Sequence, residues 1–286
     1  MLAEIMKEAM ENKDVVYFLE KGDRKYLLAF LDILGYSSKV SVKVAEDRFD
    51  DFVADIMALE ENCVPGALDV VRNKVGLVSK VRTLIFSDSV CLYWEIGDYE
   101  DDEINITEEQ FQELFEDVID FICDLQCRVL HYNILFRGAF AIGRHYQCKN
   151  VTVSEALVKA HDVEGGSMKF PRVGVDITQD NEFLNNIDFL KKLVRDGRMK
   201  QDGDVFYVDY LQMFERINTW HPCNKLIEQM TLRNNRECYL NNIAFVEEKI
   251  STDEVKKIAI LDKYRWLKEY HNQKCKELRY PELTIE

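Results

Sequence analysis

The sequence predicts an α+β fold, in which helices cover one face of a sheet. A near-continuous apolar run at residues 26–34 (YLLAFLDIL), bounded by charge before it and Gly35 after it, has the composition of a strand buried on both faces. Helical and strand-like segments then follow in the order β, α, β-hairpin, α, β, α, β. That order is typical of a split βαβ, or ferredoxin-like, arrangement.

Local signals predict each element of the first 180 residues. Residues 49–59 have helical spacing, and residues 81–86 and 90–94 predict two strands joined by a tight turn at residues 87–89. Thr107 and Gln110 have the form of a capping box, and apolar residues recur at helical intervals up to Leu125. Residues 133–142 and 171–177 are strand-like, and Ser154 can cap a short helix that ends near Glu164.

Beyond residue 180 the pattern predicts a helix at 183–194, a strand at 205–211 and a long closing helix at 252–274. Only 4 prolines and 12 glycines punctuate the chain, and no stretch is rich enough in Ser, Gly and Pro to be a free linker. We therefore expect one main domain at residues 1–180, with its motifs at 26–176. Residues 181–286 are expected to be a C-terminal extension that packs on the same domain.

Composition narrows the class of protein. The 286 residues are 47% hydrophobic and 31% charged, as in ordinary globular proteins. The formal charge of −15 would repel nucleic acid and anionic lipid, so we expect neither a nucleic-acid partner nor direct membrane contact. The 8 cysteines include no CxxC pair and are expected to be free thiols. With no signal-peptide core near residues 1–13 and no apolar run of about 18 residues, a cytoplasmic location is expected.

Two acidic residues lie where burial is expected. Asp32 interrupts the first apolar strand, and Asp88 is in the turn of the hairpin IFSDSVCLYW. Asp is a favoured turn residue, so capping the turn is the simpler interpretation of Asp88 alone. An unpaired carboxylate late in a buried strand is costly, so Asp32 should be paired or bound to a cation. If the strand and the hairpin are neighbours, the two carboxylates could together hold Mg²⁺ or Mn²⁺.

Several segments occur in the order of a known family. FLDILGYSS (30–38) resembles the opening FxDIxGF(S/T) motif of class III nucleotidyl cyclases, and FSDSV (86–90) is similar to their second metal-binding hairpin. FRGAFAIGRHY (136–146), SEALVKAHDVE (154–164) and PRVGVD (171–176) look still more like the bacterial pyrimidine cyclases of the Pycsar anti-phage systems. The resemblance covers residues 26–176.

The resemblance implies a homodimer with two composite active sites, each using two divalent cations, Mn²⁺ or Mg²⁺. Asp32 and Asp88 would be the metal carboxylates, and the backbone carbonyl of Ile33 would complete one site. The ribose 3′-hydroxyl would attack the α-phosphate and pyrophosphate would leave. The substrate implied is UTP, giving 3′,5′-cyclic UMP, with CTP as the alternative. The product would serve anti-phage defence through a separate effector that senses the cyclic nucleotide.

The same matching implies nucleotide contacts. Phe30, Gly35 and Tyr36 belong to the first motif, although Tyr36 could equally pack in the core. Thr83 lies on the hairpin strand where cyclases place a base-selecting Lys; the nearest matched residue is Leu84, which disfavours selection of a purine by that Lys. Arg137 is either an internal salt-bridge partner or a catalytic contact to phosphate, for which its planar guanidinium is suited.

One departure from the family affects the site. Many class III cyclases have an Asn and an Arg on the helix matched to 154–164, whereas this chain has Val158 and Asp162. Lys159 or Arg137 could supply the missing charge, but Lys159 is expected to be a solvated surface residue. The missing pair favours one alternative, an inactive cyclase-like dimer that binds nucleotide or a protein partner. A second alternative is an adenylate or guanylate cyclase. Zinc spacing, a Walker loop, GxSxG and GxGxxG are absent from the sequence.

Overall fold

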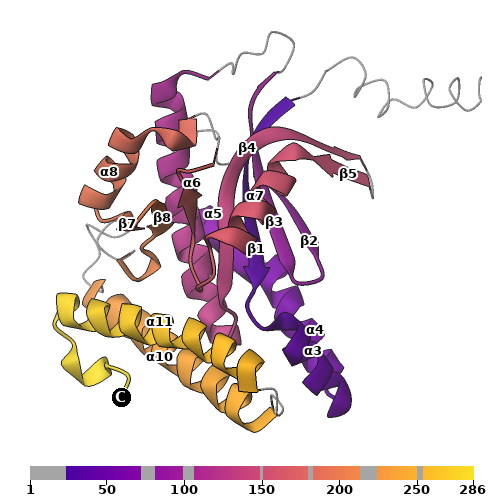
Figure 1. Cartoon of the computed structure of the whole chain (residues 1–286), viewed down its shortest axis with the longest axis vertical. Helices are drawn as coiled ribbons and strands as arrows, with labels where there is room; N and C mark the ends of the chain where they lie inside the picture. The colour runs from indigo at the N-terminus through magenta and orange to yellow at the C-terminus, as the bar shows by residue number, and fades with distance from the viewer. Residues whose placement is uncertain are drawn as a thin grey trace, which may run out of the picture.

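The structure is a computed structural model that describes residues 24–71, 81–98, 106–148, 151–179, 183–212, 224–249 and 254–286. The expectation about residues 1–13 falls outside these ranges. The described strands are β1 (Arg24–Ile33), β2 (Arg82–Phe86), β3 (Ser89–Asp98), β4 (Phe136–Cys148), β5 (Val151–Ser154), β6 (Val173–Asp176), β7 (Met199–Asp202) and β8 (Val205–Val208). They form one sheet in the order β2-β3-β1-β4-β6-β8-β7, and β5 pairs with β4 off this path (Figure 1).

The sheet is mixed. β1 lies between β3 and β4 and is antiparallel to both, and β2 is antiparallel to β3. The pair β4 and β6 is parallel, whereas β6, β8 and β7 are joined by antiparallel pairing. Together with the helices that pack on it, this sheet confirms the predicted α+β class. β8 and β7 come from beyond residue 180, so the C-terminal segment extends the same sheet.

The described α-helices are α3 (Tyr36–Ala45), α4 (Phe49–Ala58), α5 (Val64–Val71), α6 (Glu108–Val129), α7 (Glu155–Gly166), α8 (Ile187–Arg195), α10 (Asn224–Lys249) and α11 (Glu254–Leu278). In Figure 1, α7 lies in front of the sheet and α10 and α11 run side by side along its lower edge. The predicted closing helix corresponds to α11, and the predicted helix at 49–59 corresponds to α4.

Helices cover both faces of the centre of the sheet, so the expectation of one covered face was wrong. Leu27 and Leu31 of β1 belong to the larger core, which includes α6. Leu28 and Phe30 point to the opposite face, where Ala156 and Ala160 of α7 pack against them. Because successive side chains of a strand alternate between faces, an apolar run without polar interruptions requires cover on both.

The predicted helix starts agree with the observed caps. Thr107 accepts a hydrogen bond from the Gln110 backbone N–H (3.2 Å), and the Gln110 side chain accepts one from the Thr107 N–H (3.0 Å). Ser154 accepts from the Leu157 N–H at 3.0 Å and begins α7. Each cap satisfies an N–H group that the first helical turn leaves without a partner.

Candidate active site

Asp32 and Asp88 are brought to the same end of two neighbouring strands. Asp32 is the last but one residue of β1 and is paired with Ser89, the first residue of β3. Asp88 precedes Ser89 in the turn after β2, and its carbonyl accepts a hydrogen bond from the Ile33 N–H at 2.8 Å. This bond fixes the hairpin turn against the end of β1. The sequence-based expectation that strand one and the hairpin adjoin is therefore met by the strand pairing.

The two carboxylates influence one another electrostatically. Burial raises the pKa of Asp32, Arg137 lowers it, and the negative charge of Asp88 raises it again. Asp88 is partly exposed, and among the described residues its carboxylate has no hydrogen bond or ion pair. Two carboxylates held close together repel one another unless a cation or a proton lies between them.

Arg137 is the direct partner of Asp32. The two residues are paired across β1 and β4, so their side chains share one face of the sheet. The Arg137 Nε–H donates to Asp32 Oδ2 at 2.7 Å, and Glu164 Oε1 also lies 2.6 Å from the same nitrogen. The internal salt bridge considered for Arg137 is thus present, and the phosphate contact stays a prediction.

Glu164 is held at this site by the helix that covers the strand. Ala156, Ala160 and Glu164 recur every four residues along α7, so all three face the sheet. Burial raises the pKa of Glu164, Arg137 lowers it, and Asp32 raises it. Because one guanidinium N–H lies between two carboxylates, the cluster retains an excess of negative charge. Glu164 was not singled out from the sequence, although it ends the motif SEALVKAHDVE.

A fourth charged residue comes from the C-terminal segment. Lys263 of α11 is half-buried near Arg137, Asp32 and Glu164; burial and the charge of Arg137 lower its pKa, and the two carboxylates raise it. No sequence signal connected Lys263 with these residues, because their proximity depends on how α11 packs against the sheet.

The donor set at the strand ends suits a hard divalent cation. Arg137 occupies Oδ2 of Asp32, which leaves Oδ1 and both oxygens of Asp88 without a hydrogen-bonding partner in the described part of the chain. Carboxylate and carbonyl oxygens are the ligands that Mg²⁺ and Mn²⁺ prefer. No cluster of three or more His, Cys, Asp or Glu side chains suited to a metal occurs among the described residues. The predicted site has only two carboxylates, which matches cations that also bind substrate phosphates.

Of the other predicted nucleotide contacts, Phe30, Gly35 and Tyr36 lie near this end of β1, whereas Thr83 of β2 is aligned, through Leu92 of β3, with Ala29. Gly35 has φ +77°, a conformation that favours glycine, and it precedes the first turn of α3. The Tyr36 ring packs on Phe52 with 5.2 Å between centroids, which fits the alternative of a packing role. Phe30 is buried beneath α7, and Thr83 is exposed on the edge strand β2. A nucleotide contact by any of these residues stays a prediction.

The matched positions on α7 point outward. Val158 is 61% exposed and the Asp162 side chain is 72% exposed. Lys159 forms an ion pair with Glu155 at 2.9 Å and donates to the Ile142 carbonyl at 3.4 Å. Lys159 is therefore engaged by Glu155 and the Ile142 carbonyl and does not reach toward Asp32.

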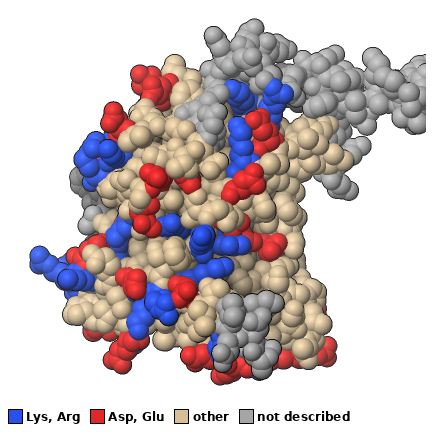
Figure 2. Space-filling model, in the orientation of Figure 1, with Lys and Arg blue, Asp and Glu red and all other residues tan. Residues whose placement is uncertain are grey.

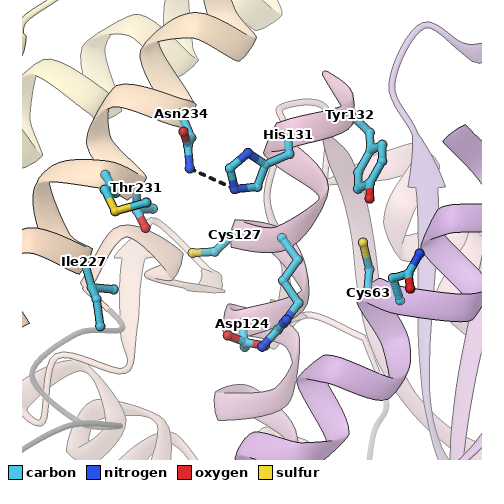
Figure 3. A pocket seen from close by; sticks show the side chains of 11 residues that line it. Cys63, Asp124, Cys127, His131, Tyr132, Ile227, Thr231 and Asn234 are labelled. Atoms are coloured by element: carbon cyan, nitrogen blue, oxygen red, sulfur yellow. Dashed lines mark hydrogen bonds and ion pairs between the residues drawn. The ribbon is translucent and has the colours of Figure 1, made fainter. Parts of the chain in front are cut away.

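A pocket of about 370 Å³ lies between α6 and α10 (Figure 3). Its polar side chains are not arranged as a catalytic site. Burial raises the pKa of the Cys63 thiol to about 11 and that of Cys127 well above its usual value, so both thiols are protonated at neutral pH. His131 is hydrogen-bonded to Asn234 at 3.1 Å, and Asp124 is paired with Arg128. His131 and Asp124 therefore already have partners, and Asp32 is not among the residues that line this pocket.

No family model, curated protein or solved structure matches the chain. In the described part of the chain, no helix has the length and apolar character needed to cross a membrane.

Proposed function

We propose that the protein is a pyrimidine nucleotide cyclase that converts UTP to 3′,5′-cyclic UMP and pyrophosphate, with CTP as the alternative substrate. The observation that carries the proposal is the meeting of Asp32 and Asp88 at adjoining strand ends, where Asp88 raises the pKa of Asp32. The strand order supports it, because β3 lies between β1 and β2 while β4 flanks β1. That order is the split βαβ arrangement that the cyclase resemblance implies.

The residues in place suit the reaction. The free oxygens of Asp32 and Asp88, with the Ile33 carbonyl, would hold divalent cations, which when bound lower the pKa of a hydroxyl and neutralise phosphate charge. The 3′-oxygen forms a bond to the α-phosphorus, the bond from that phosphorus to the bridging oxygen breaks, and the hydroxyl proton passes to solvent. The protein's own contribution is to position the ribose hydroxyl in line with the leaving pyrophosphate.

The start of α3 supports triphosphate binding near these carboxylates. Gly35 precedes the helix without a side-chain cap, so the first backbone N–H groups have no capping oxygen. Such N–H groups and the helix dipole favour an anion. Because Gly35 is three residues after Asp32, phosphate oxygens here would lie close to cations held by the carboxylates.

A homodimer belongs to the same proposal. Val151 and Val153 of β5 and Val158 of α7 are 57%, 66% and 61% exposed. Large apolar side chains left exposed on neighbouring segments are candidates for a protein interface. A second copy would pack on this outer side of β5 and α7, as the homodimer implied by the resemblance requires. The role in anti-phage defence and the separate effector rest on the resemblance alone.

Incubation of the purified protein with Mn²⁺ and each of the four nucleoside triphosphates tests the activity. We expect a cyclic pyrimidine nucleotide and pyrophosphate. Asp32→Asn and Asp88→Asn should each abolish product, whereas the exposed Asp204→Asn should leave it unchanged. Cyclic AMP or cyclic GMP as the main product would favour a purine cyclase. A folded dimer that makes no cyclic product from any of the four would contradict the proposal.

A nucleotide-binding protein without turnover is the second candidate. The engagement of Asp32 by Arg137 and the outward position of Val158 favour it, since neither helps transition-state stabilisation. Calorimetry with UTP and Mn²⁺, followed by product analysis of the same sample, separates the two. Saturable binding without pyrophosphate release would support the second candidate.

A further inference from the structure

A pocket of about 550 Å³ lies beside the candidate active site, under α11. Its wall includes Arg137 of β4, Lys169 and Phe170 from the loop before β6, and Lys263, Arg265 and Trp266 of α11. The volume is within the range of about 300–1,000 Å³ that is usual for small-molecule sites. Arg137 belongs both to this wall and to the ion pair with Asp32, so the pocket adjoins the end of β1 through this residue.

The pocket is basic in an acidic protein. Its wall contains four Lys or Arg residues against two acidic residues, although the whole chain carries −15. Figure 2 shows Lys and Arg side chains gathered across the middle of the face that carries α7 and α11. Positive charge concentrated in a hollow attracts anions even where the molecule as a whole repels them.

Two of the four cations are available to a ligand. Arg265 is paired with Asp262, and Arg137 is shared between Asp32 and Glu164. Lys169 is exposed and Lys263 is half-buried, and within the described ranges neither ammonium has a hydrogen bond or a salt bridge. Burial and the nearby charge of Arg137 disfavour the charged form of Lys263, and an anion bound beside it would offset that penalty.

Stacked aromatic rings hold the wall in place. Phe170 stacks on Trp266 with 5.5 Å between centroids, and Trp266 stacks on Tyr270 at 5.3 Å. The Arg172 guanidinium lies 5.3 Å from the Phe170 ring. Since Lys169 adjoins Phe170 and Lys263 lies three residues before Trp266, this stack fixes the two backbones that carry the free ammonium groups. A preformed site loses less entropy when a ligand binds.

We propose that this pocket holds phosphate oxygens of the triphosphate substrate and of the pyrophosphate product, with Lys263 and Lys169 as the contacting cations. The inference rests on the proposed cyclase function. α11 thereby supplies, from the C-terminal segment, the positive charge that α7 lacks at Val158 and Asp162. Arg137 lines the pocket and is paired with Asp32, so phosphates bound in the pocket would lie next to the same guanidinium that holds Asp32.

Calorimetric titration with pyrophosphate in the presence of EDTA tests the pocket without metal and without turnover. We expect the wild-type protein to bind, and Lys263→Gln to weaken binding about tenfold or more, as the loss of one charge-assisted hydrogen bond would. Lys169→Gln should weaken it less, because this side chain is exposed. Lys268→Gln, on the same helix but outside the pocket, is the matched control. Equal affinity in Lys263→Gln and wild type, or no binding by wild type, would overturn the inference.

The result can be separated from the fate of the proposed function. If pyrophosphate binds through Lys263 but no triphosphate is converted, the phosphate pocket is supported and the cyclase proposal is contradicted. If Lys263→Gln makes cyclic product with unchanged kcat and KM, the cyclase proposal is supported and the phosphate pocket is contradicted. Lys263→Arg keeps the charge and should retain binding. Thermal unfolding of each variant shows whether a loss of binding reflects a loss of fold.

Discussion

At the scale of single residues, Arg137 determines the electrostatics of the candidate site. Its Nε–H donates to Asp32, and Glu164 lies at ion-pair distance from the same nitrogen without receiving that hydrogen. Glu164 Oε1 is buried and has no hydrogen-bonding partner. A buried carboxylate with an incomplete set of partners favours the protonated form, which agrees with the raised pKa of Glu164.

Glu164 should make the protein less stable as the pH rises. Its folded-state pKa is above the usual 4.5, so the folded protein binds more protons than the unfolded chain over the interval between the two values. The stabilisation is full below about 4.5 and is lost as the pH rises through the folded pKa. The Glu164→Gln variant has no ionisable group at this position, so it does not lose this stabilisation. The difference in free energy of unfolding, variant minus wild type, should therefore increase between pH 4 and 7, as measured by denaturant titration.

Glu155, on the same helix, is the matched control with the opposite sign. Burial raises its pKa, but the hydrogen bonds from Lys159 and the Arg144 backbone outweigh burial, and the net pKa is lowered. Its ionised form is favoured by folding, so Glu155→Gln should lose stability relative to wild type as the pH rises from below the folded pKa to about 4.5, and the difference should stay constant above that. The same pH trend in both variants would contradict the conclusion that folding disfavours the ionised form of Glu164.

At the scale of elements, close contact between β1 and β4 places Asp32 opposite Arg137. Gly138 follows Arg137, and a Cβ built at Gly138 would lie 2.0 Å from the Phe30 carbonyl oxygen. The backbone of β1 leaves no room for a side chain there. The glycine after Arg137 in the sequence FRGAF therefore has a packing reason, and it controls how near β4 lies to β1.

Gly138→Ala should separate the strands and destabilise the fold. Overpacking of this kind typically costs about 1–3 kcal/mol, and a clash with backbone belongs at the upper end. Gly165→Ala is the control, because a Cβ at Gly165 in α7 meets nothing within 4 Å. That replacement should be neutral or stabilise by about 0.4–1 kcal/mol. Chemical denaturation of both variants measures the difference; similar free energies of unfolding would show that the strands can move apart freely.

Hydrophobic periodicity predicted those elements whose buried side is apolar. β1, α6 and the hairpin β2–β3 all present apolar faces and were predicted near their observed bounds. α10 was missed although it spans Asn224–Lys249, because its inward side is partly polar: Thr231, Asn235 and Asn242 are buried. α3 has no buried residue, and β7 (MKQD) is a short edge strand, so neither carries a pattern.

The part of the candidate site that is built from neighbouring strands of the sheet could be predicted from the sequence. Asp32 and Asp88 could be placed together because a strand and a hairpin in a split βαβ sheet are neighbours. Glu164 was visible only as the end of a motif. Lys263 could not be anticipated, because it is more than a hundred residues from Arg137 in the chain and only the packing of α11 brings the two into one pocket.

At the scale of the whole molecule, the C-terminal segment is joined to the sheet through a buried polar cluster. β8 pairs with β6 and is followed by Asp209, which is 3% exposed. Lys274 of α11 is 1% exposed, and its ammonium donates to Asp209 and Gln212 at 2.7 Å each. Tyr270 also donates to Asp209 at 2.6 Å. α11 is thereby fixed over the sheet in the position that brings Lys263 to the candidate site.

Lys274→Met should therefore weaken both stability and the proposed phosphate site. Removing one partner of a buried ion pair leaves the other charge uncompensated, which costs about 3–5 kcal/mol. Lys268→Met on the same helix is partly exposed, has no ion pair with a described residue and should change stability by less than about 0.5 kcal/mol. Urea denaturation gives both values. If Lys274→Met unfolds like wild type, the hydrogen bond from Tyr270 is enough to stabilise Asp209, and α11 does not depend on the Lys274 ion pair for its position. If it is destabilised but still folded, pyrophosphate affinity should fall with it, because Lys263 is positioned by the same helix.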